Sequence, residues 1–164
     1  MIALKKVLVA TDFSEPSGAA LAYGRELAHN FGAQLVVLHV TESMITAGMA
    51  PEAYIGFDVD AQRQLESWNL AQLEGLLDDT ARRELRAKTV LLKGTPAVAI
   101  VDYAREHAVD LIVLGTHGRG AVAHLLMGSV AERVVRTAPC PVLTVRHPER
   151  EFVLPDAVAS EAKA

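Results

Sequence analysis

The chain has 164 residues, which suits one domain, and 51% of them are hydrophobic, enough for a substantial core. Its 16 basic and 20 acidic side chains leave a net charge of −4 without a basic stripe, which argues against nucleic acid as a partner. No apolar run approaches the ~20 residues that span a bilayer, and no signal-peptide pattern follows Met1. With a single cysteine there is no internal disulfide, and we expect a cytoplasmic protein.

Five short apolar runs alternate with helical stretches along the chain. They cover residues 7–10, 35–40, 89–92, 111–114 and 142–145. The runs are nearly continuous in hydrophobicity, as in parallel strands buried on both faces. This alternation predicts an α/β fold with one doubly wound parallel sheet and helices on both faces. Ligands of such sheets bind outside the carboxyl ends of the strands, where the strand order reverses.

Four helical stretches lie between the runs, and each carries one apolar face that is expected to cover the sheet. The predicted inward residues are Ala20, Tyr23, Gly24 and Leu27 in the first stretch, Trp68, Leu73, Leu76 and Leu77 in the second, Ala97, Ile100, Val101 and Ala104 in the third, and Ala131, Val134, Val135 and Ala138 in the fourth. Residues 43–58 form a long connection, which is either a lid over the crevice or a loop without a ligand role.

The most informative motif is G-x2-G-x9-G-S, formed by Gly115, Gly118, Gly128 and Ser129 after the fourth apolar run. Glycine lets a backbone approach an anion closely. Backbone amides at the start of a helix attract phosphate, and Gly128, Ser129 and Val130 stand where the last helix is expected to begin. The motif therefore predicts a phosphate-binding loop. The alternative is a tight strand-to-helix connection without a ligand.

This motif resembles the nucleotide-binding loop of the universal stress protein family, in its ATP-binding branch. Residues 10–14, 110–115 and 138–142 are also similar to that family. The resemblance implies a Rossmann-like sheet of five parallel strands in the order 3-2-1-4-5. It also implies an α/β nucleotide-binding domain over residues 1–146, followed by a tail at residues 147–164 that we expect to be poorly ordered.

The resemblance implies that ATP binds at the carboxyl ends of the strands, and it leaves open whether Mg²⁺ accompanies the nucleotide. Asp12 could accept from adenine or ribose or hold Mg²⁺ through water, and the alternative is a cap for the first helix. Val40 would offer main-chain groups to the adenine edge, and Arg119 would screen phosphate charge. The predicted nucleotide-binding residues are Ala10, Asp12, Val40, Gly115, Gly118, Arg119, Gly128, Ser129 and Val130.

Other signals in the sequence favour binding over catalysis. The G-x-G-x-x-A match at residues 118–123 comes too late in the chain for a dinucleotide fingerprint, because only one helix and one strand follow it. There is no P-loop lysine motif and no hydrolase elbow. We interpret His39 as a satisfied core imidazole and Cys140 as a small residue at a strand start, and we predict no metal site.

Phosphoryl transfer normally needs a general base, an arginine finger and metal ligands, and beyond Asp12 the sequence indicates none of them. We therefore expect an ATP-binding regulatory protein of stress adaptation rather than a slow ATPase or phosphotransferase that uses the same pocket. A dimeric scaffold without nucleotide is a third reading. Pro139 and Pro141 suit an edge position for the last strand. By resemblance that strand, residues 142–145, would pair with its copy in a homodimer, and the protein effector is unknown.

Overall fold

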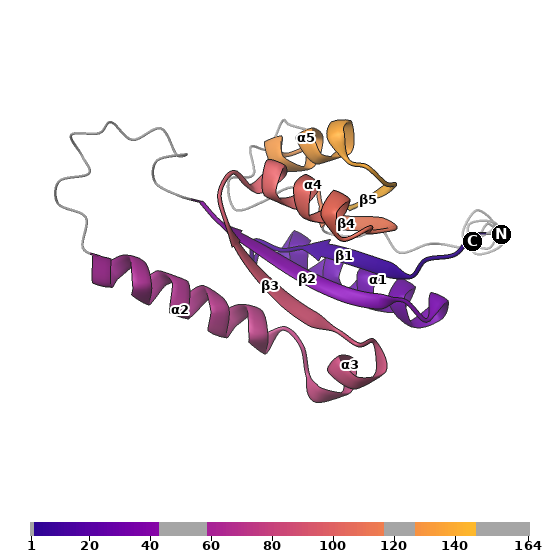
Figure 1. The fold of residues 1–164 in the computed structure, drawn as a ribbon, viewed down its shortest axis with the longest axis horizontal. Helices are drawn as coiled ribbons and strands as arrows, with labels where there is room; N and C mark the ends of the chain where they lie inside the picture. Colours follow the sequence, from indigo (N-terminus) through magenta and orange to yellow (C-terminus); the bar gives the residue numbers. More distant parts are fainter. Residues whose placement is uncertain (1, 43–58, 117–126, 147–164) are drawn as a thin grey trace, which may run out of the picture.

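The sheet has five parallel strands in the order β3-β2-β1-β4-β5, which confirms the predicted topology (Figure 1). The computed structural model describes residues 2–42, 59–116 and 127–146. The strands are β1 (Lys6–Ala10), β2 (Gln34–Thr41), β3 (Lys88–Lys93), β4 (Leu111–Gly115) and β5 (Val142–Val145). Each begins and ends within one residue of its predicted run, because a continuous apolar run bounded by polar residues marks a strand buried on both faces.

The described residues form five helices, one more than the sequence predicted. They are α1 (Glu15–Phe31), α2 (Val59–Gly75), α3 (Asp79–Glu84), α4 (Pro96–Glu106) and α5 (Ser129–Thr137). The additional helix is α3, which starts where the carboxylate of Asp78 accepts a hydrogen bond from the amide of Ala81 at 2.7 Å. This N-cap divides the second predicted stretch into two helices. None of the helices described is both long and apolar enough to cross a membrane.

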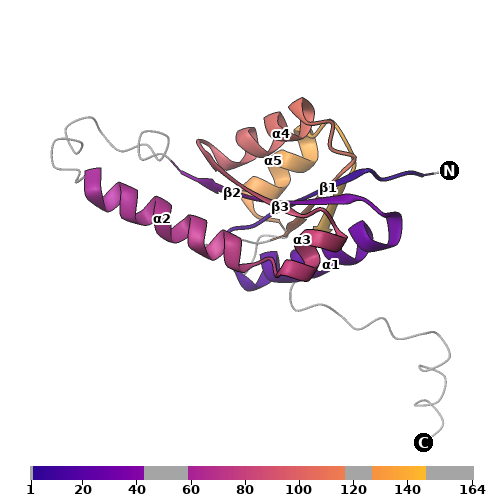
Figure 2. The ribbon, with the colours of Figure 1, turned by 60° about the horizontal axis from the view of Figure 1, so that its bottom comes forward.

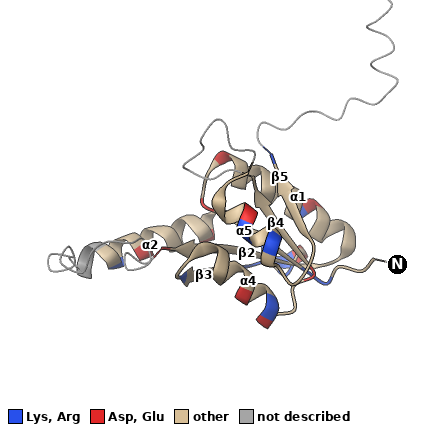
Figure 3. Ribbon diagram, turned by 90° about the horizontal axis from the view of Figure 1, so that it is seen from above, with Lys and Arg blue, Asp and Glu red and all other residues tan. Residues whose placement is uncertain are grey.

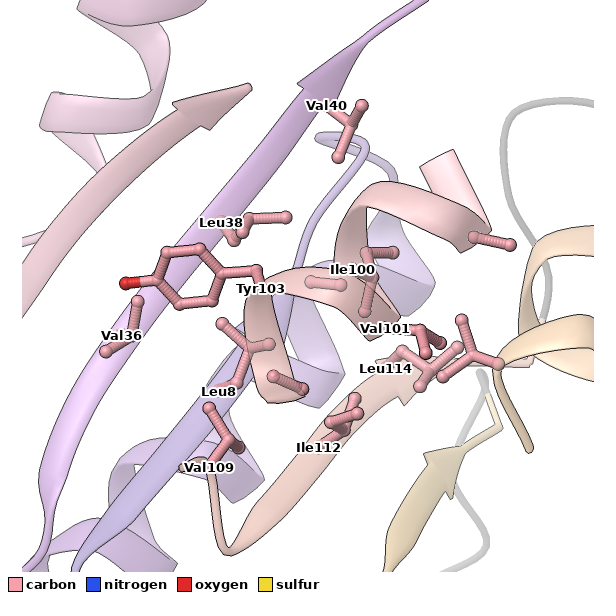
Figure 4. Packing of buried hydrophobic residues seen from close by; sticks show 14 of the residues in the cluster. Leu8, Val36, Leu38, Val40, Ile100, Val101, Tyr103, Val109, Ile112 and Leu114 are labelled. Carbon is pink, nitrogen blue, oxygen red and sulfur yellow. The ribbon is translucent and has the colours of Figure 1, made fainter. Parts of the chain in front are cut away.

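Two layers of helices enclose the sheet. Helices α1, α2 and α3 cover one face, and α4 and α5 cover the other (Figure 2). Side chains alternate between the two faces, so that Val7 and Val9 of β1 meet the α1 side while Leu8 and Ala10 meet the α4 side. Figure 4 shows Leu8 and Ile112 packed against the α4 side chains in that second core.

Most predicted inward residues are buried or half-buried, and three are not. All four in α4 are buried, as are Leu73 and Leu77. In contrast, Tyr23, Val135 and Trp68 are 37%, 45% and 50% exposed. Trp68 turns away from the sheet, whereas the next residue, Asn69, is buried and donates to the hydroxyl of Thr41 at the end of β2 at 3.2 Å. Tyr23 and Val135 each adjoin a buried residue and sit at the margin of their helix's contact face.

Helix α1 approaches β1 closely at Gly24, and this contact generates a prediction. A Cβ at Gly24 would lie 2.2 Å from Cγ2 of the buried Val9, whereas one at Gly18 of the same helix would meet nothing within 4 Å. We expect Gly24→Ala to lower the free energy of unfolding by about 1–3 kcal/mol through overpacking. Gly18→Ala is the control and should raise it by up to ~1 kcal/mol, because alanine favours helix.

Urea denaturation of the two variants measures both effects. Equal stability of the Gly24→Ala and Gly18→Ala proteins would contradict the close approach of α1 to the sheet.

Candidate functional site

The predicted site residues that the structure describes lie at one edge of the sheet, where the carboxyl ends of β1, β2 and β4 meet. Ala10 is in register with Leu38 of β2 on one side and with Leu114 of β4 on the other. Asp12, Val40 and Gly115 therefore come from neighbouring strand ends. The strand order reverses between β1 and β4, because the chain adds β2 and β3 on one side of β1 and β4 and β5 on the other. Parallel α/β sheets bind ligands at such a point.

The turn from β1 into α1 places Asp12 at this edge. Asp12 is half-buried, and its Oδ1 accepts hydrogen bonds from the backbone amide of Ser14 at 3.1 Å and from the Ser14 hydroxyl at 2.5 Å. Ser14 is the N-cap residue of α1 and makes no side-chain cap bond. These bonds brace the turn itself, rather than capping an amide within the first helical turn, which was the alternative reading of Asp12.

Phe13, between Asp12 and Ser14, has a backbone φ of 65°. Non-glycine residues rarely adopt this left-handed conformation, and it costs roughly 1–2 kcal/mol. The Phe13 ring lies against the imidazole of His39, with 4.4 Å between ring centroids. His39 is buried in β2, and its Nδ1 lies 2.8 Å from the carbonyl oxygen of Thr11. The sequence predicted a satisfied core histidine correctly, but it did not reveal the contact with Phe13.

Gly115 is required by packing against α1. A Cβ at this position would lie 2.9 Å from the carbonyl carbon of Pro16 and 3.0 Å from its Cβ. The motif had suggested that this glycine makes room for an anion. The structure adds a packing reason for this glycine, since any side chain would push the start of α1 away from β4. The same contact brings the Asp12 turn next to the end of β4.

Helix α5 begins at the same edge. The amide of Gly128, the N-cap residue, donates to the carbonyl oxygen of Thr116 at 2.6 Å, which fixes the start of the helix just beyond β4. The N-cap residue of α5 is a glycine, which has no side chain to cap the first turn. Ser129 is the first helical residue and is exposed, whereas Val130 is half-buried. The positive end of this helix dipole therefore lies at the carboxyl edge of the sheet, where an anion would be stabilised.

The α4 side of the edge is apolar. Ala10 and Val40 belong to the buried cluster that also contains Leu114, and Val130 packs against that cluster. Figure 4 shows Val40 near the end of β2, on the side of the sheet that α4 covers. The edge thus combines an apolar wall, a carboxylate on the β1 turn and the start of a helix. Such a combination suits a ligand with a flat apolar ring and a negative charge.

Two predicted site residues, Gly118 and Arg119, lie outside the described residues, and so do the connection at residues 43–58 and the tail. Within the described ranges no three His, Cys, Asp or Glu side chains are grouped as a metal site. Burial raises the pKa of the Cys140 thiol, and a thiol held in its protonated form is a poor nucleophile. Figure 3 shows that α4 and α5 carry both acidic and basic residues.

Comparison with known proteins places the fold and the site in context. The family model described as the universal stress protein family matches residues 3–146. A universal stress protein of Thermus aquaticus is 38% identical over 87% of this chain and 98% of its own length. Universal stress protein MJ0531 of Methanocaldococcus jannaschii is 31% identical over 90% of this chain and 85% of its own length.

Solved structures show the same architecture. The universal stress protein UspA from Lactobacillus plantarum is 27% identical and superposes with a TM-score of 0.70, covering 89% of this chain and all of that one. The family match spans every described strand and helix, including the turn that carries Asp12 and the start of α5. This chain therefore belongs to the universal stress protein family.

Proposed function

We propose that the protein binds ATP at the carboxyl edge of β1, β2 and β4, and that it acts in stress adaptation through interactions that depend on the nucleotide. One observation carries this proposal: the start of α5, whose N-cap is a glycine, lies at the switch point beside the apolar wall of Ala10 and Val40. A phosphate chain suits the helix start. An adenine ring suits the wall.

We propose the roles of the site residues from the sequence motif and, for the residues that the structure describes, also from their positions. Asp12 on the β1 turn accepts from the adenine amino group or a ribose hydroxyl, and the main chain of Val40 pairs with the adenine edge. Gly115 and Gly118 begin the loop around ribose and phosphate, with Arg119 screening phosphate charge. The phosphates bind at the start of α5, to Gly128, Ser129 and the amide of Val130.

Related folds hold adenine nucleotides elsewhere in the family. One universal stress protein was solved in complex with cAMP, and one from Archaeoglobus fulgidus in complex with dAMP, with TM-scores of 0.64 and 0.57. Each is 24% identical to this chain and shares its fold. For this chain we propose ATP, because its loop motif resembles the ATP-binding branch of the family and a helix start suits a chain of phosphates.

We also propose how the protein assembles and in which compartment it acts. Strand β5 is at the edge of the sheet, next to β4 only. Apolar edge strands need a partner or a cover, so we propose a homodimer in which β5 pairs with its copy, with residues 1–146 as the folded unit and the cytoplasm as its compartment. Slow ATP hydrolysis or phosphotransfer in the same pocket remains the alternative activity.

Removing the Asp12 carboxylate is the first test. We expect Asp12→Ala to weaken ATP binding about tenfold or more, because a charge-assisted hydrogen bond contributes roughly 1.5–3 kcal/mol. Asp79→Ala, in α3, is the matched control and should bind like the wild type. Calorimetric titration with and without Mg²⁺ measures both affinity and the metal requirement. An Asp12→Ala protein that binds normally but loses a measurable ATPase rate would favour the enzyme alternative.

The start of α5 can be blocked without changing the fold. Gly128 has φ −70° and ψ 154°, a conformation that valine adopts readily. We expect Gly128→Val to place two methyl groups beside the first-turn amides and to reduce ATP affinity at least tenfold, with an unchanged circular dichroism spectrum. Gly18→Val, on the exposed side of α1, is the control. Normal ATP binding by a folded Gly128→Val protein would refute the pocket assignment.

The proposed dimer predicts which residue of β5 is exposed to a partner. The amide of Ile112 donates to Pro141 and that of Thr116 donates to Val145, so the odd-numbered residues of β5 turn their backbone groups toward β4. Thr144 then turns its amide outward. We expect Thr144→Pro to yield a folded monomer in sedimentation velocity, because proline removes the outward donor. A dimer that survives this change would exclude pairing through β5.

A further inference from the structure

The turn that carries Asp12 is held by a network that involves His39. The last backbone bond described between β1 and β2 runs from the amide of Thr11 to the carbonyl oxygen of Leu38, at 2.9 Å. The carbonyl of Thr11 itself accepts from the imidazole of His39 at 2.8 Å. A carbonyl oxygen can only accept, so Nδ1 of His39 carries the proton. The His39 side chain thereby extends the ladder to the residue directly before Asp12.

A second set of bonds orients the same turn from its other side. Ser17 Oγ donates to the carbonyl of Ser14 at 2.8 Å, which uses the only hydroxyl hydrogen of Ser17. Thr11 Oγ1, at 3.0 Å, must therefore donate to Ser17 Oγ, and it accepts from the amide of Phe13 at 3.0 Å. Thr11 and Ser17 are both buried. Each of these two hydroxyl groups thus has one fixed donor role and one fixed acceptor role, which leaves the turn little freedom.

The ring contact joins the two sets. Phe13 adopts its left-handed φ of 65° with its ring 4.4 Å from that of His39. An aromatic residue holds this conformation only where its surroundings enforce it. Here the surroundings are His39 on one side and the Thr11 hydroxyl on the other. Since Phe13 lies between Asp12 and Ser14, its conformation places the amide and hydroxyl of Ser14 that hold the Asp12 carboxylate.

We propose that His39 and Phe13 are positioning residues for nucleotide binding: together they hold the β1–α1 turn in the conformation that presents Asp12 to the ligand. The inference rests on the proposed function for the identity of the ligand. Its other part, that His39 and Phe13 hold the turn, does not depend on a ligand. His39 acts through Thr11 and Phe13 rather than by touching the nucleotide.

The chain offers a matched control for His39. His107, after the end of α4, also has its Nδ1 at hydrogen-bond distance from a carbonyl, that of Tyr103 at 3.0 Å, and its ring stacks on the Tyr103 ring with 3.9 Å between centroids. It precedes β4, so it lies at the amino edge of the sheet, opposite the Asp12 turn. His39→Phe and His107→Phe remove the same kind of bond and keep an aromatic ring.

The experiment measures two quantities on each full-length variant. The first is the hydrogen-exchange rate of the Ser14 amide without nucleotide, because this amide donates to Asp12 Oδ1. The second is ATP affinity by calorimetry. We expect His39→Phe to speed Ser14 exchange and to weaken ATP binding about five- to tenfold, as expected for one lost buried hydrogen bond. His107→Phe should change neither quantity. Phe13→Leu, which keeps apolar volume but loses the ring contact, should act like His39→Phe.

The outcomes separate this inference from the proposed function. Ser14 exchange at the wild-type rate in both the His39→Phe and Phe13→Leu proteins would overturn the inference. Faster exchange with unchanged ATP affinity would overturn the positioning role, and so would equal loss of affinity in the His107→Phe protein. If wild-type protein does not bind ATP, the proposed function fails, and Ser14 exchange still decides whether His39 and Phe13 hold the turn.

Discussion

Helix α1 lies closer to the sheet than side chains would allow, and the rest of the site depends on this approach. At Gly24 the helix backbone meets Val9 of β1, and at its first turn Pro16 meets Gly115 of β4. Two glycines, one on the helix and one on a strand, therefore allow α1 to lie close to the sheet at two points. Because Gly115 ends β4 and Pro16 follows the Asp12 turn, this contact joins the two strand ends between which the strand order reverses.

Because α1 lies so close to the sheet, the connection from β1 to α1 is short, and its backbone adopts an unusual conformation. Four residues, 11–14, separate the end of β1 from the first residue of α1. Phe13 adopts a positive φ within this turn, at a cost of roughly 1–2 kcal/mol. Buried hydrogen bonds of about 1 kcal/mol each offset it, and their donors and acceptors are supplied by Thr11, Ser17 and His39.

The sequence predicted those parts of the fold that depend on local pattern. Continuous apolar runs located all five strands, and the predicted inward face of α4 was correct because its apolar residues repeat with the helical period. The strand order came with the family resemblance. Trp68 was placed wrongly because hydrophobicity favoured it, whereas the neighbouring side chain that is buried against the end of the sheet is polar, Asn69. The separate helix α3 was missed because it follows the apolar stripe that ends at Leu77 and is itself mostly polar, with its N-cap at Asp78.

For the proposed site, the sequence predicted where several residues lie in the fold, but not the contacts that hold them there. Spacing indicated correctly that Asp12, Gly115 and Gly128 stand at strand and helix ends. It could not reveal that Gly115 is needed against Pro16, because that contact joins segments far apart in the sequence. The conformation of Phe13 has no local signal either: its residue type disfavours a positive φ, and the His39 ring that supports it comes from another strand.

Thr116 connects the two halves of the proposed function. Its carbonyl accepts from the amide of Gly128 at the start of α5, and its own amide donates to the carbonyl of Val145 in β5, at 2.6 and 2.8 Å. The helix start proposed to hold phosphate and the edge strand proposed to form the dimer are thus bonded to one buried residue. A ligand that shifts α5 must either break the bond to Thr116 or move β5 with it. Nucleotide-dependent interactions therefore need no long-range change in this fold, because the groups involved are already neighbours.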